Sequence, residues 1–264
     1  MNIDGKTILV TGASGGIGRE IARALAAKGA RLIVSGRDHN KLTQLAAQLG
    51  DTAVIVSADM GTAEGRSAIV NTCEAEGVDI VVHSAGTLDF ALFANQDADA
   101  IETMVNLNFL APVLLSRALV PILEQRPQGA MVFVGSTFGS IGHPGFSVYC
   151  ATKFGLRGFA ESLRRELADT PIQIHYLAPR ATTTDLNSDS VVALNHALGN
   201  TSDTPQIVAA EVIGMLTSAT GRNRYIGWPE KLLVRLNALL PAIVDRALGK
   251  KLAIIRRYAQ KQPG

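Results

Sequence analysis

The first 35 residues constrain the fold more strongly than any later part of the chain. Residues 7–11 (TILVT) are apolar and rich in β-branched side chains, which predicts a short buried strand. A glycine-rich turn follows, and then Ile17, Ile21 and Leu25 recur at helical spacing until Gly29 ends the helix. A second strand is expected at residues 31–35 (RLIVS). Strand, turn, helix and strand make a βαβ unit, which implies a parallel sheet.

The same alternation continues along the chain. Further helices are expected at 40–49, 62–76, 97–124 and 148–168, and further strands at 53–57, 79–83, 130–135 and 172–177. This order predicts an α/β fold, a doubly wound, Rossmann-like parallel sheet with helices on both faces. We find no Pro/Gly/Ser-rich linker and no shift in composition, so residues 1–228 are expected to form a single domain.

Composition excludes several classes of partner. The formal net charge is +2 and charged residues are 18% of the chain, so no overall field attracts nucleic acid. With only Cys73 and Cys150, a disulfide framework is not expected. The N-terminus lacks the pattern of a signal peptide, and no uninterrupted apolar stretch has the length of a membrane span. We therefore expect a cytoplasmic protein.

Three interpretations compete for the glycine turn that follows residue 11. Glycines between a strand and a helix let the backbone approach the pyrophosphate of a dinucleotide, which then sits at the helix N-terminus. Residues 12–16 (GASGG) also satisfy the G-x-S-x-G pattern of a hydrolase nucleophile elbow. That interpretation is disfavoured, because an elbow needs earlier strands to supply its oxyanion hole and only ten residues precede Thr11. The third alternative is a turn that binds nothing.

Tyr149 and Lys153 lie four positions apart in a predicted helix, so they share one face of it. An ammonium group beside a phenol favours the ionised phenol and lowers its pKa, so we expect Tyr149 to donate and accept protons near neutral pH. Ser136 precedes Tyr149 by thirteen positions and ends a predicted strand.

Taken in order, these motifs resemble the short-chain dehydrogenase/reductase family, and the resemblance runs from about residue 5 to residue 185. It implies an oxidoreductase that interconverts a carbonyl and a secondary or primary alcohol with a nicotinamide cofactor, and no metal ion. It implies four catalytic residues, Asn106, Ser136, Tyr149 and Lys153. It also implies a set of cofactor-binding residues: Gly12, Ser14, Ile17, Gly18, Arg37, Asp59, Met60, Ala85, Gly86, Tyr149, Lys153, Thr182 and Thr184.

Several positions depart from the family pattern or leave a choice open. Where members that prefer NAD carry an acid, this chain has Gly36 and Arg37, so Arg37 either binds the 2′-phosphate of NADP(H), as we predict, or points to solvent. Asn106 is chosen as the proton-relay residue over Asn108, which points elsewhere on a regular helix. His83 replaces an amide of the family and is expected to be structural. Arg180 replaces a glycine and either faces solvent or contacts the cofactor or an acidic group of the substrate.

Two segments after the sixth strand bear on the substrate and on partners. Residues 180–204 are rich in Thr, Ser, Asn and Asp and are expected to form a substrate lid. Residues 229–264 read as a basic amphipathic helical extension. This extension either lies on an anionic membrane surface, or covers a groove of its own chain or a partner subunit. Each alternative suits a lipophilic substrate.

Two functional hypotheses remain. The first is an NADP(H)-dependent oxidoreductase acting on a small-molecule carbonyl or alcohol. The second is a catalytically silent NADP(H)-binding sensor or scaffold protein of the same fold. The resemblance also implies a homo-dimer or homo-tetramer that assembles through the two long helices carrying Asn106 and Tyr149.

Overall fold

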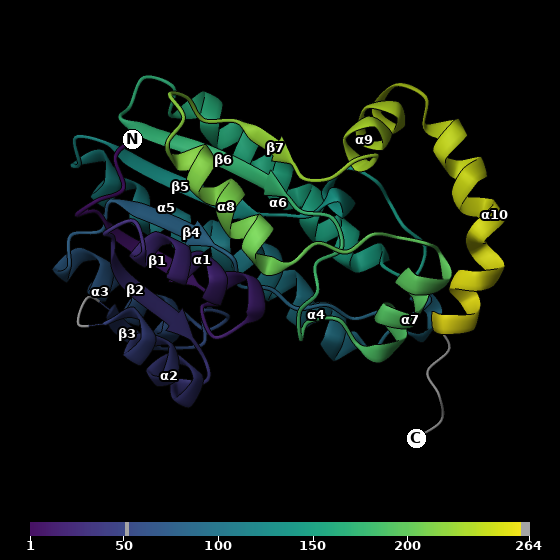
Figure 1. The fold of residues 1–264 in the computed structure, drawn as a ribbon, viewed down its shortest axis with the longest axis horizontal. Helices are drawn as coiled ribbons and strands as arrows, with labels where there is room; N and C mark the ends of the chain where they lie inside the picture. Colours follow the sequence, from purple (N-terminus) through teal and green to yellow (C-terminus); the bar gives the residue numbers. More distant parts are fainter. Residues whose placement is uncertain (51–52, 260–264) are drawn as a thin grey trace.

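The computed structural model describes residues 1–50 and 53–259, and the strands in these ranges form one parallel sheet of seven in the order β3-β2-β1-β4-β5-β6-β7 (Figure 1). The strand order reverses between β1 and β4, which creates a crevice at their carboxyl ends. The strands are β1 Thr7–Thr11, β2 Arg31–Gly36, β3 Ala53–Ser57, β4 Ile80–His83, β5 Gly129–Val134, β6 Ile172–Ala178 and β7 Asn223–Tyr225. The predicted doubly wound sheet is confirmed.

Helices cover both faces of the sheet. Alternate residues of β1 point to opposite faces, so Ile8 packs in one buried cluster and Leu9 in the other. The first cluster is closed by α1 (Gly16–Ala26), α2 (His39–Leu49) and α8 (Pro205–Leu216). The second is closed by α3 (Ala63–Ala75), α5 (Ala111–Glu124) and α6 (Ser147–Glu166), beside which α4 (Ala98–Val105) lies. These two apolar layers hold the carboxyl ends of β1, β4 and β5 in fixed positions.

The predicted helix at 97–124 contains a wider turn. Helix α4 is followed by a π-helical turn, η2 (Asn106–Leu110), before α5 begins. Pro112 has no N–H to donate to a carbonyl four residues earlier, and its ring would collide with that carbonyl. The π turn removes this conflict, and such turns are frequent at functional sites. By length and composition alone residues 98–124 could cross a membrane, but Leu115, Leu119 and Leu123 are buried against the sheet, which accounts for their apolar character.

One helix and one strand were not predicted from the sequence. Helix α8 is apolar around most of its circumference and packs on α1, so it shows little of the amphipathic period by which helices are recognised. Strand β7 (NRY) is short, polar and half-buried, and it pairs with β6 at the edge of the sheet. Two short 3-10 turns complete the region before α6: η1 (Phe93–Asn95) and η3 (Thr137–Gly139).

The predicted lid contains one helix, α7 (Asp189–Ala197), and the tail folds as α9 (Glu230–Leu239) and α10 (Pro241–Ala259). In Figure 1, α10 stands at the edge of the molecule beside α7, away from the sheet. A third buried cluster joins Ile255 and Ala259 of α10 to Val191 and Leu194 of α7. The tail therefore packs against the lid helix, and the division of the chain at residue 228 stays a prediction.

Candidate active site

The glycine turn after β1 forms the floor of a cleft at the point where the strand order reverses. Gly12 has a φ of +68°, and a Cβ atom there would lie 2.6 Å from the Cα of Ala85. At Gly18 a Cβ atom would overlap the carbonyl of Gly12. Only glycine fits these two positions, so the backbone is open to a ligand lying above it. Helix α1 begins at Gly16, and its N-terminus faces the same cleft.

This cleft encloses about 1050 Å³, including its mouth. It is lined by ten of the predicted cofactor residues: Gly12, Ser14, Ile17, Gly18, Arg37, Asp59, Met60, Ala85, Gly86 and Thr184. A second cleft of about 750 Å³ contains Thr182, Ser136 and Tyr149, and its other lining side chains are largely apolar. Ile17, Thr184 and Leu186 line both clefts, so the two are adjoining parts of one site.

Ser136, Tyr149 and Lys153 meet at the carboxyl end of β5. The Ser136 hydroxyl oxygen accepts a hydrogen bond from the Phe138 N–H at 3.1 Å, which leaves its proton free to be donated. The Lys153 ammonium is buried, donates to the Val134 carbonyl at 3.2 Å and lies 5.6 Å from the centre of the Tyr149 ring. The spacing of four residues along α6 thus places the Tyr149 phenol and the Lys153 ammonium on one face of the helix, as predicted.

Burial acts on the two ionisable groups in opposite directions. It lowers the pKa of Lys153 to about 8, because the charged ammonium is deprived of water. It raises the pKa of Tyr149 to about 12, and the hydrogen bond with Ser136 only partly opposes that shift. The expectation that Lys153 brings the phenol pKa toward neutrality is therefore wrong for the chain by itself.

The prediction for Asn106 is also wrong in its geometry. The Asn106 side chain donates to the Gly61 carbonyl at 3.0 Å, in the loop that follows β3. Asn108 is buried and holds the loop after β4, donating to the Thr87 carbonyl at 2.9 Å and accepting from the Thr87 N–H at 2.7 Å. A Cβ atom on Gly86 would lie 3.2 Å from the Asn108 side-chain oxygen and 3.7 Å from the Lys153 nitrogen. Asn108 is therefore the amide beside the buried ammonium.

Comparison with known proteins identifies this arrangement. Residues 6–194 match the family model described as short chain dehydrogenase. The chain belongs to the short chain dehydrogenase family. The resemblance drawn from the motifs is confirmed, the protein is an oxidoreductase of that family, and the hydrolase interpretation of the GASGG turn is excluded.

The individual relatives agree with this assignment. Over 222 residues the chain is 35% identical to nodulation protein G of a Rhizobium species, covering 82% of this chain and 91% of the relative. Over 186 residues it is 33% identical to the 3-oxoacyl-[acyl-carrier-protein] reductase FabG of Rickettsia felis, covering 70% and 76%. A solved serine dehydrogenase complexed with NADP⁺ is 28% identical with a TM-score of 0.77, over 83% of this chain and 94% of that one.

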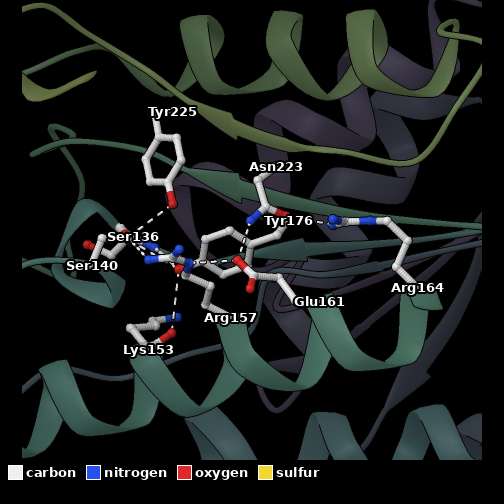
Figure 2. Close-up of polar contacts among 9 residues, drawn as sticks. All are labelled: Ser136, Ser140, Lys153, Arg157, Glu161, Arg164, Tyr176, Asn223 and Tyr225. Atoms are coloured by element: carbon white, nitrogen blue, oxygen red, sulfur yellow. Dashed lines mark hydrogen bonds and ion pairs between the residues drawn. The ribbon is translucent and has the colours of Figure 1, made fainter. Parts of the chain in front are cut away.

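Tyr176 of β6 is a residue of this dehydrogenase that sequence reasoning missed. Its buried hydroxyl accepts from the Ser136 N–H at 3.3 Å and lies 3.2 Å from the Ser136 carbonyl and 3.5 Å from that of Lys153. Figure 2 shows this hydroxyl between the Ser136 loop and the helix that carries Lys153. A Cβ atom on Gly135 or Gly139 would overlap the phenol. The tyrosine thus supports the backbone on which two site residues stand.

Around Tyr176, side chains tie the site to the edge of the sheet (Figure 2). Arg157 donates to the Ser140 hydroxyl and to Glu161, both at 2.8 Å. The Ser140 hydroxyl also lies 3.1 Å from that of Tyr225 on β7. Glu161 accepts from Asn223 of the same strand at 2.6 Å. The short strand β7, which the sequence did not reveal, therefore braces the loop that follows Ser136.

Lys41 is a second basic residue in the dehydrogenase's first cleft, together with Arg37. Both side chains are exposed, and Lys41 stands in the first turn of α2. The sequence could have indicated Lys41, because it follows Arg37 by four positions. The end of β2 and the start of α2 meet at these positions.

Arg180 and His83 take structural positions in this dehydrogenase. Arg180 pairs with Asp203 at 2.6 Å and with Glu230 at 3.5 Å, so it joins the lid to α9 instead of facing solvent. His83 is buried, stacks on Phe133 with ring centres 4.8 Å apart and lies 3.0 Å from the Ser116 hydroxyl. Burial lowers the His83 pKa to about 3, so the ring is neutral.

Proposed function

We propose that the protein is an NADP(H)-dependent oxidoreductase that interconverts a carbonyl and a secondary or primary alcohol on a lipophilic substrate. One observation carries the proposal: Ser136 and Tyr149 line an apolar cleft that adjoins the glycine-lined cleft, with Lys153 beneath them. When bound over the glycine turn, the nicotinamide cofactor supplies or accepts the hydride.

The residues of the chain then handle the proton and the developing charge. In the reduction, Tyr149 donates its phenolic proton to the oxygen of the former carbonyl. The Ser136 hydroxyl donates a hydrogen bond to the same oxygen and stabilises its negative charge. The Lys153 ammonium stabilises the phenolate that remains and holds hydroxyl groups of the cofactor ribose. Asn108, which lies beside Lys153, replaces Asn106 as the proposed residue for passing protons to solvent.

The preference for NADP(H) rests on the end of β2. A Cβ atom on Gly36 would lie 2.7 Å from the Ser14 hydroxyl oxygen, and Arg37 and Lys41 line the same cleft. Lys41 lies 3.7 Å from the Asp38 carboxylate, and the cleft is also lined by Asp59 and Asp185. Two cations four residues apart at the end of β2 suit a 2′-phosphate. We expect Arg37→Ala combined with Lys41→Ala to lower kcat/KM for NADPH by roughly a hundredfold or more, with little change for NADH. Arg31→Ala, at the opposite end of β2, is the matched control.

The proposal of a lipophilic substrate is based on the side chains that line the second cleft. Phe138, Phe146 and Leu194 contribute apolar surface, and His143 stacks on Phe138 with its pKa lowered by burial. The Arg180 cation is already paired with two carboxylates, so it does not offer a free charge to an acidic substrate. The FabG relative is named for a 3-oxoacyl substrate, which fits a cleft of this character.

Removal of the Tyr149 hydroxyl group tests the assignment of Tyr149 as the proton donor. We expect Tyr149→Phe to abolish NADPH-dependent reduction over a series of ketones and aldehydes of increasing chain length, while NADPH binding measured by fluorescence stays largely intact. Substantial reduction by this variant would contradict the assignment. A wild-type protein that binds NADPH and reduces none of the series would instead favour the silent sensor or scaffold.

The proposal also includes a cytoplasmic homo-oligomer with peripheral membrane contact through the tail. Val105, Leu110 and Phe154 are exposed apolar residues on α4, η2 and α6, three elements that contact one another. Self-association there would remove this apolar surface from water.

A further inference from the structure

The outer side of the two C-terminal helices carries an apolar surface rimmed by cations. We call this surface the tail face and define it by six exposed residues: Leu239, Leu240, Ile243, Lys250, Ile254 and Arg257. Leu239 is 80% exposed and Leu240 53%, values unusual for leucine in a folded domain. Several such residues together mark an interaction site more often than chance exposure.

The orientation of the tail face is fixed by the opposite side of α10. Val244, Ile255 and Ala259 are buried, and α10 packs against the lid helix α7. At 100° per residue, Ile243, Lys250, Ile254 and Arg257 fall on the other side of the helix, within a narrow arc. The tail therefore covers its own lid with one side and presents the tail face with the other.

Charge decides which kind of partner suits this face. Residues 229–264 contain eight basic and two acidic residues, whereas the rest of the chain has four more acidic than basic residues. One of the two acids, Glu230, is paired with Arg180. An anionic surface would therefore attract the tail and repel the remainder of the molecule, which sets a single orientation. A second tail face would be repelled by the same positive charge.

We propose that the tail face docks on an anionic lipid bilayer and holds the lid helix α7 at the lipid surface. Leu239, Leu240 and Ile243, at the junction of α9 and α10, enter the boundary between headgroups and acyl chains, while Lys250 and Arg257 contact lipid phosphates. Val191 and Leu194 of α7, which pack on α10, also line the substrate cleft. Docking thus brings a lipid-dissolved substrate to the cleft, a consequence that rests on the proposed function.

Vesicle binding by the full-length protein tests the proposal. Truncation before residue 229 is unsuitable, because it would remove Glu230 and Asn237, which contact Arg180 and Ser140. We expect binding to vesicles of phosphatidylcholine with one third phosphatidylglycerol, and much weaker binding to phosphatidylcholine alone. Lys250→Gln combined with Arg257→Gln should weaken binding roughly 30-fold, from about 1 kcal/mol for each cation near the surface. Leu239→Ser combined with Ile243→Ser should weaken it about tenfold or more.

Ile207→Ser provides the matched control, because Ile207 is an exposed apolar residue on α8, which packs on α1 and lies outside the tail face. Its binding should equal that of the wild type. The proposal is overturned if anionic vesicles do not bind the protein, or if both double variants bind as the wild type does. It is also overturned if Leu239→Ser with Ile243→Ser halves the mass in sedimentation velocity, since the face would then join two copies.

The failure of the docking proposal can be told apart from the failure of the proposed function. Reduction of a short, water-soluble ketone with NADPH in the absence of vesicles tests the chemistry alone. Activity in that assay without vesicle binding contradicts only the proposed docking of the tail face. Vesicle binding without activity contradicts only the proposed oxidoreductase reaction.

Discussion

Among single residues, Lys153 is a cation that the fold buries within the site. It is buried, and its ammonium donates a hydrogen bond to the Val134 carbonyl in place of water. Its pKa falls from 10.5 to about 8. Between these values the unfolded chain binds more protons than the folded one, so this residue's contribution to the free energy of unfolding rises with pH across that window. Below pH 8 the ammonium is charged in both states, so its burial lowers the free energy of unfolding there.

A pH profile follows from the same shift. The ammonium persists below pH 8 and is lost above it. We expect kcat/KM for carbonyl reduction to be level below that pH and to fall above it, since the neutral amine no longer stabilises the Tyr149 phenolate. Initial rates across the pH range check this. A rate that stays level up to the onset of alkaline unfolding would show that Lys153 does not titrate there.

Tyr176 is predicted to position the catalytic serine. Tyr176→Phe keeps the ring that fills the space beside Gly135 and removes only the hydroxyl that binds the Ser136 backbone. We expect kcat to fall about tenfold with unchanged KM for NADPH, and the free energy of unfolding to fall by about 1 kcal/mol. Tyr225→Phe is the matched control, because that hydroxyl contacts Ser140 and not Ser136. Equal losses in the two variants would argue against a specific role for Tyr176.

Among the elements, the lid depends on one ion-pair cluster. Arg180 follows β6 and reaches Asp203 at the far end of the lid, where Thr182 and Asp203 also form a β-bridge. Asp203 is 6% exposed, so its charge has little access to water. The cluster fixes both ends of the lid against α9.

Removal of the Arg180 cation should therefore lower the stability of the folded protein. We expect Arg180→Ala to lower the free energy of unfolding by about 3 kcal/mol, because Asp203 would remain buried without its partner. Adding Asp203→Asn should recover part of the loss, since the buried charge is then gone. Urea unfolding measures both variants, and limited proteolysis within 183–204 reports lid opening. A double variant no more stable than Arg180→Ala would contradict this account.

For the whole molecule, the exposed apolar residues of the long helices predict self-association. Phe154 is 42% exposed on α6, close to the π turn that bears Leu110. We expect Phe154→Asp to shift the protein from dimer or tetramer to monomer in sedimentation velocity, because a buried carboxylate would face its own copy. Val192→Asp, on the outer side of the lid helix, should leave the mass unchanged. A wild-type protein that is monomeric would remove the basis of this prediction.

The sequence by itself determined the order of the fold and the chemical types at its centre. Apolar runs alternating with helical periods specify six of the strands, since period and β-branching are local properties. Gly12 and Gly18 were found because a close backbone approach needs glycine, and Tyr149 and Lys153 because a spacing of four fixes a shared helix face. These features depend on neighbours in the chain.

Tertiary structure decided the features that depend on distant neighbours. Asn106 and Asn108 both lie in the π turn before Pro112. Asn108 lies beside Gly86 together with Lys153, whereas Asn106 binds the Gly61 carbonyl, and these contacts join distant parts of the chain. Tyr176 is part of the site because β6 pairs with β5. Strand β7 pairs with the other edge of β6. The Tyr149 pKa shift has the opposite sign to the one expected, because burial outweighs the hydrogen bond with Ser136. Burial and long-range pairing are set by the whole fold, so no local pattern contains them.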